Sequence, residues 1–158
     1  MLGDYIWEGV KSGGWRMTFY EYVHEAMKTL SKIIPTELEE LKRKNIPPPR
    51  RIIAIPSEHE PFGFYDHKVE VCVITIGYMP TRIISPIHSL LHEIAHHKQY
   101  YEAGKNPKKA WGDRGRWAKK RSEWSADMYA YRRFLKHGDV YKELVEEFKK
   151  YMEGEYDP

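Results

Sequence analysis

The sequence predicts an α+β domain, in which a short, partly antiparallel β-sheet packs on a central helix and on a second, glutamate-bearing helix. Three observations predict this class. Apolar residues recur with the helical period in 18–34 and 140–152, so we expect helices at the N- and C-terminal ends. Two runs rich in β-branched residues, 50–55 and 68–78, have the composition of strands. A Ser-Pro pair at 85–86 opens a further helix, which Gly104 ends.

Composition indicates one folded domain, 1–158, with 41% hydrophobic and 31% charged residues. Cys72 is the one cysteine, which excludes an intramolecular disulfide, and its apolar neighbours favour a packing role. We see no basic-then-apolar leader and no run of the roughly 20 apolar residues that spans a bilayer. We therefore expect a cytoplasmic protein without a membrane partner. The net charge of +3 is too small to indicate nucleic-acid binding on its own.

The N-terminal part divides into an arm and a helical segment. Residues 1–15 are rich in glycine and aromatics, and we expect an irregular arm that packs on the body or lies across the cleft as a plug. The helical segment 18–44 is predicted to be two helices, because Pro35 should end the first and start the second. A proline run at 47–49 then leads into the core, 50–137.

Two strands are expected before the helix that Ser85 opens. The first is 50–55 and the second is 68–78, whose continuous apolar character predicts burial on both faces. Residues 56–67, rich in Pro, Gly and charge, are predicted to be a loop.

The central helix, predicted over 85–103, carries two histidines four residues apart, His92 and His96. Side chains at i and i+4 share one helical face, so both imidazoles can reach one metal ion. Glu93 lies beside that face, where it can act as general base on a metal-bound water without being a ligand. Surrounding apolar residues predict that the helix is buried, and buried imidazoles need a partner.

A zinc site requires a third protein ligand, and we predict that Glu123 supplies it. Asp127 follows four residues later on the same helical face. We expect its carboxylate to accept the free N–H of His92 and to fix the tautomer of that ring.

The pattern His92-Glu93-x-x-His96 with Glu123 and Asp127 resembles the gluzincin metallopeptidases, and the short chain resembles the minigluzincins and the ImmA/IrrE family. The likeness covers 69–135, under half the chain. It implies a zincin-like domain, a Zn²⁺ cofactor, hydrolysis of peptide bonds, and an edge strand within 69–78 that pairs with an extended peptide. A third histidine ligand, His137, is the less favoured alternative to Glu123.

Peptide hydrolysis also needs a donor that stabilises the oxyanion. Tyr129 and Tyr131 are our candidates on the second helix. Tyr100, Tyr101 and His137 remain alternatives, because spacing does not choose among them.

The segment 105–121, which we call the basic segment, has eight Lys and Arg residues against Asp113. We expect a solvated loop with Trp111 and Trp117 packed inward, although basic residues interleaved with aromatics can also bind nucleic acid. Lying between the halves of the metal site in sequence, it can alternatively act as a lid or docking surface. The second site helix is expected to run from 115 or 116 to 136, and a C-terminal helix over 139–153.

Three functions remain open from the sequence. The first is a zinc-dependent metallopeptidase with a peptide or protein substrate, kept latent by a terminal segment. The second is a regulatory protease of the ImmA/IrrE kind that acts on one partner protein. The third is a non-catalytic, zinc-stabilised module that binds nucleic acid through the basic segment, 105–121.

Overall fold

A computed structural model describes residues 6–7, 17–57, 63–76, 84–112, 115–140 and 142. The predicted C-terminal helix 139–153 and the predicted arm 1–15 lie largely outside these ranges. Of the arm, the structure describes only β1 (Ile6–Trp7), which pairs antiparallel with β2 (Met17–Thr18).

The main sheet has three strands in the order β3-β5-β4. β3 (Arg51–Pro56) runs parallel to β5 (Val71–Ile76), and β4 (Gly63–Asp66) runs antiparallel to it. The described fold is therefore α+β with a small mixed sheet, as the sequence predicts.

Two predictions about this sheet are wrong. β4 lies within the predicted loop 56–67. It was missed because four residues after a Pro- and Gly-rich stretch are too few to show strand periodicity. The strand that precedes the central helix was expected to be the edge, but β5 is the middle strand. Its almost complete burial agrees with the predicted cover on both faces, and the edge on its antiparallel side is β4.

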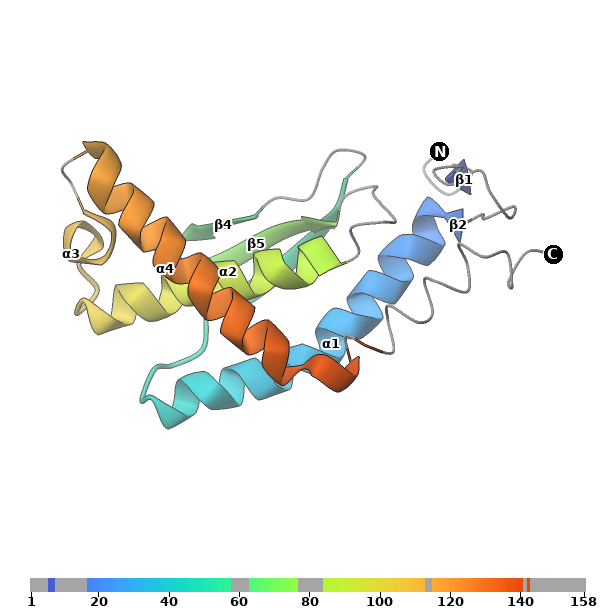
Figure 1. The fold of residues 1–158 in the computed structure, drawn as a ribbon, viewed down its shortest axis with the longest axis horizontal. Helices are drawn as coiled ribbons and strands as arrows, with labels where there is room; N and C mark the ends of the chain where they lie inside the picture. The colour runs from blue at the N-terminus through green and yellow to red at the C-terminus, as the bar shows by residue number, and fades with distance from the viewer. Residues whose placement is uncertain are drawn as a thin grey trace.

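The first helix is also longer than predicted. α1 (Phe19–Arg43) is one continuous helix that contains Pro35, and Figure 1 shows it bending along its length. Proline removes one backbone hydrogen bond and kinks a helix, but packing of the residues on both sides can preserve the helix. Leu30, Ile33 and Leu41, which flank the proline, are all buried in the core.

The central helix is α2 (Ile84–Glu102), and it ends as predicted, with Gly104 at a φ of 66°. α3 (Pro107–Trp111) is a short helix, and α4 (Gly115–Lys136) is the second site helix. Figure 1 shows α4 crossing α2 on the side opposite the sheet, so α2 lies between them. Among the described residues, none of the helices combines the length and the apolar composition that spanning a bilayer requires.

The core lies where α1, α2 and β5 meet. Its fully buried members include Ile74, Ile76, Leu90, Leu91 and Ile94. α4 adds Ala126 and Ala130, whose small side chains let it approach α2 closely. This close approach brings the carboxylates of α4 to the histidines of α2.

An ion pair locks α1 to α4. Glu37 is fully buried and accepts hydrogen bonds at 2.9–3.0 Å from the guanidinium of Arg133. His137 Nε2 lies 2.6 Å from Glu37 Oε2. His137 therefore bonds to Glu37 at the junction of α1 and α4. It is neither the third ligand nor the oxyanion donor considered above.

Candidate metal centre

Three predicted ligands converge between α2 and α4. His92 Nε2 and His96 Nε2 are 3.0 Å apart. Glu123 reaches both rings, with Oε2 at 2.9 Å from His92 Nε2 and Oε1 at 3.2 Å from His96 Nε2. The structure therefore brings His92, His96 and Glu123 together as the sequence predicts.

The proton positions on His96 follow from its neighbours. Trp111 Nε1–H donates to Gln99 Oε1, and Gln99 Nε2 donates to the carbonyl of Ser122, so the amide orientation of Gln99 is determined. Gln99 Oε1 lies 2.9 Å from His96 Nδ1. Because that oxygen only accepts, the proton of neutral His96 is on Nδ1 and its Nε2 carries a lone pair.

His92 is oriented in the same way by Asp127. His92 Nδ1 lies 2.7 Å from Asp127 Oδ1, so an N–H on Nδ1 donates to the carboxylate. Nε2 of neutral His92 then also carries a lone pair, directed at His96 and Glu123. This is the contact that the sequence predicts for Asp127.

Such an arrangement fits a bound cation. Two imidazole lone pairs and a carboxylate face one another with no N–H among them, which is unfavourable unless a positive charge joins them. Ligands on a tetrahedral zinc with bonds of about 2.0–2.1 Å are separated by about 3.3 Å, near the spacings found here. Nitrogen and carboxylate donors in this number suit zinc, although the same set also accepts other divalent transition metals.

Glu93 lies on the sheet side of the histidine pair. Its side chain is only 4% exposed, and its carboxylate lies against the backbone of Gly63, the first residue of β4. Burial raises the pKa of Glu93 to about 7; the charge that His92 can carry opposes this shift, and the carboxylates of Glu123 and Asp127 add to it. The acidic group of the motif is thus held in a desolvated position beside the edge strand.

The histidine that follows the motif is structural. His97 is fully buried, and its Nε2–H donates to the carbonyl of Pro47 at 2.7 Å. Its Nδ1 accepts from the hydroxyl of Tyr65 at 2.7 Å. Burial lowers the pKa of His97, which favours the neutral ring that this pattern of bonds requires. His97 therefore ties α2 to β4 and to the segment after α1.

The proposed oxyanion donors do not join the metal centre in the described contacts. Tyr129 packs on the core with Lys44 and Lys98 over its ring, and its buried hydroxyl has no hydrogen-bond partner among the described residues. Tyr131 is 56% exposed. Tyr101 donates to Glu70, and Tyr100 stacks on Trp111.

Within the basic segment, α3 occupies residues 107–111, where a loop was predicted, and α4 begins at Gly115, as predicted. α3 presents Lys108 and Lys109 to solvent. Trp111 points inward, as predicted, with its ring stacked on Tyr100 at 5.7 Å between centroids and edge-on to His96. The side chain of Trp117 lies outside the described residues. Through Trp111, the segment supports the hydrogen bond that orients His96.

Sequence reasoning missed three residues of this centre. Gln99 is three residues after His96, a spacing that places both on one helical face and was available as a signal. Gly63 had no signal, because its closeness to Glu93 depends on the hairpin of β4 and β5. His88, one turn before His92 on α2, was not among the predicted site residues, but its Nε2 lies 3.3 Å from Asp127 Oδ1.

Comparison with known proteins adds no relative. The chain matches no protein-family model, no curated protein and no solved structure. We therefore infer the function of the chain from the residues and distances of this centre.

Proposed function

We propose that this protein is a zinc-dependent metallopeptidase of the gluzincin type. The observation that carries the proposal is the convergence of His92 Nε2, His96 Nε2 and Glu123 within 2.9–3.2 Å, with both rings held in the metal-binding tautomer. A metal held by three protein groups leaves a coordination position for a reactant, which is typical of catalytic and not of structural zinc sites.

In this proposal His92, His96 and Glu123 hold the ion. Zinc supplies Lewis acidity, which makes water a stronger acid and polarises a carbonyl group. Asp127 and Gln99 keep the two rings in place by accepting their Nδ1 protons. Such outer hydrogen bonds increase the affinity of histidine ligands for metal.

Glu93 acts as the general base. It accepts a proton from the attacking water as the C–O bond forms, and it delivers that proton to the amine as the C–N bond breaks. Its placement supports this role, since it directly follows a ligand on α2 and is buried against the end of β4. Burial restricts the side chain to the neighbourhood of the ion.

The substrate is a peptide segment in extended conformation. Among the described residues β4 pairs only with β5, so the outer edge of β4 offers backbone groups for another strand. A peptide that pairs there passes Gly63 and hence Glu93. Backbone pairing of this kind gives affinity, while pockets for alternate side chains give specificity.

Both peptidase functions considered from the sequence share this chemistry. A general peptidase and a regulatory protease with one partner differ only in which extended segments reach β4. A folded partner protein must present such a segment as an exposed loop or terminus.

The test is Glu93→Gln, assayed with a library of internally quenched peptides. We expect the variant to retain zinc and to lose cleavage at least a hundredfold, because the general base is removed while the ligands remain. Glu102→Gln is the matched control on the exposed face of α2, and it should cleave like wild type. Cleavage by Glu93→Gln at the wild-type rate, or no cleavage by the zinc-loaded wild type, would overturn the proposal.

A further inference from the structure

Histidines and carboxylates form two facing rows between α2 and α4. His88, His92 and His96 are spaced four residues apart on α2, and Glu123 and Asp127 are spaced four apart on α4. The combination of two histidines and one carboxylate therefore occurs twice, one helical turn apart: His92 and His96 with Glu123, and His88 and His92 with Asp127.

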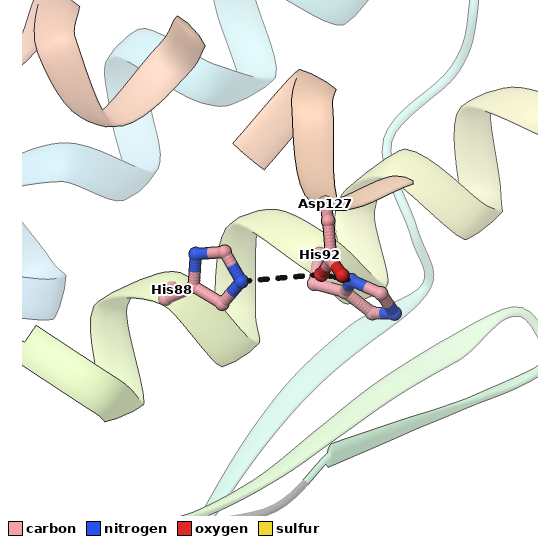
Figure 2. A group of neighbouring side chains, drawn as sticks. All are labelled: His88, His92 and Asp127. Carbon is pink, nitrogen blue, oxygen red and sulfur yellow. Dashed lines mark hydrogen bonds and ion pairs between the residues drawn. The ribbon is translucent and has the colours of Figure 1, made fainter. Parts of the chain in front are cut away.

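The second group differs from the first in its hydrogen bonding. Figure 2 shows Asp127 reaching from α4 to the imidazoles of His88 and His92. The 2.7 Å contact between Asp127 Oδ1 and His92 Nδ1 is a normal hydrogen bond. His88 Nε2 lies 3.3 Å from the same oxygen, which is long for such a bond but close to the separation of two ligands on one zinc ion.

We propose that His88 Nε2 and the Asp127 carboxylate form a second metal site, which binds a divalent transition-metal ion such as zinc more weakly than the first site does. An imidazole with a carboxylate selects such ions over magnesium or calcium, which prefer oxygen alone. His92 is not a ligand of this second ion, because its Nδ1–H donates to Asp127 and leaves that nitrogen without a free lone pair. Water completes the coordination.

Exposure explains why this site is the weaker one. Both ligands of the second site are exposed, His88 by 44% and Asp127 by 57%, whereas in the first site only Glu123 is so exposed, at 47%, and His92 and His96 are 14% and 10% exposed. Two exposed ligands must give up more conformational freedom and hold the ion with fewer bonds. The second ion should therefore bind at zinc concentrations well above those that fill the first site.

Sharing of Asp127 couples the two sites. A cation on its carboxylate draws charge from the oxygen that accepts the His92 N–H, and so weakens the bond that orients His92. Loss of such an outer hydrogen bond reduces metal affinity about 10–100-fold. We expect a partial effect, with release of the first ion accelerated up to about tenfold.

The experiment is a calorimetric titration of the metal-free chain with zinc. Wild type should bind a first ion tightly and a second at least a hundredfold more weakly. His88→Ala should lose the second ion and keep the first. His24→Ala, an exposed histidine on α1, is the matched control and should keep both.

Glu123→Ala separates this inference from the proposed peptidase. It should lose the tight ion and retain the weak one, since His88 and Asp127 remain. Weak binding without any tight ion in wild type would remove the basis of the peptidase while supporting the second site. A single zinc at saturation, or a weak ion that persists in His88→Ala, would overturn the inference.

Discussion

Gly63 lies so close to Glu93 that a β-carbon at residue 63 would be 2.9 Å from Glu93 Oε2 and 3.0 Å from Glu93 Cγ. The same β-carbon would be 3.1 Å from the carbonyl oxygen of Val73 on the neighbouring strand. The edge strand and the acidic group of the motif therefore share one space, which only glycine leaves open. This contact joins the edge strand proposed to bind substrate to Glu93, the proposed general base.

Gly63→Ala should displace Glu93 or push β4 away from β5. We expect cleavage to fall at least tenfold while zinc binding persists, because the ligands are not touched. Overpacking of this kind costs about 1–3 kcal/mol of the free energy of unfolding. Gly138→Ala is the control, since a β-carbon there meets nothing within 4 Å. Unchanged cleavage in Gly63→Ala would show that Glu93 does not need this position.

Gln99 offers a test of the tautomer argument. Gln99→Leu removes the acceptor of the His96 Nδ1 proton at similar volume. We expect the dissociation constant for zinc to rise about 10–100-fold, measured by competition with a chelator. Glu102→Leu, on the exposed face of α2, should bind zinc like wild type. Equal affinities of the two variants would mean that Gln99 does not orient His96.

We expect that breaking the buried ion pair between Glu37 and Arg133 lowers the free energy of unfolding strongly, although the pair lies away from the metal centre. Glu37→Ala leaves the guanidinium of Arg133, which is 13% exposed, without its partner. Breaking such a pair from one side costs about 3–5 kcal/mol, measured by urea unfolding. Glu39→Ala, on the exposed face of the same helix, should change stability by less than about 0.5 kcal/mol. Similar losses for both would contradict a locking role for Glu37.

Alkaline pH should destabilise the fold through Tyr65. Burial, and then the charges of Cys72 and Glu70, raise the pKa of this phenol above its ordinary value of about 10. Above pH 10 the unfolded chain therefore loses a proton that the folded chain keeps. The free energy of unfolding falls by up to about 1.4 kcal/mol per pH unit from this group.

Unfolding in urea between pH 8 and 11 measures this slope. Tyr65→Phe should be less stable at pH 8, because the bond to His97 is lost, but its stability should fall less steeply with pH. Tyr131→Phe, at a position that is 56% exposed, should follow the wild-type slope. A Tyr65→Phe curve parallel to wild type would contradict this prediction.

Local patterns predicted the parts of the centre that depend on one helix. Spacing alone placed His92 with His96 and Glu123 with Asp127, because i and i+4 share a face on any α-helix. The Ser-Pro start and the Gly104 stop of α2 were equally local. We predicted that these two helices face each other because a zinc site needs a third ligand.

Contacts between elements that are distant in the sequence could not be predicted from local patterns. Pro35 was read as a helix end, because its preference is local and the packing of Ile33 and Leu41 that keeps α1 continuous is not. β4 became visible only through its pairing with β5, and with it the closeness of Gly63 to Glu93. The inward position of Tyr129 likewise depends on how α4 packs on α1, which helical spacing does not determine.

The most direct test of the metal centre is zinc X-ray absorption spectroscopy of the chain loaded with one equivalent of zinc. We expect two imidazole ligands with further oxygen ligands at bond lengths of about 2.0–2.2 Å. Glu123→Ala should lower zinc affinity while its spectrum retains both imidazoles. A wild-type spectrum without two imidazoles, or a spectrum and affinity that Glu123→Ala leaves unchanged, would contradict the proposed metal centre.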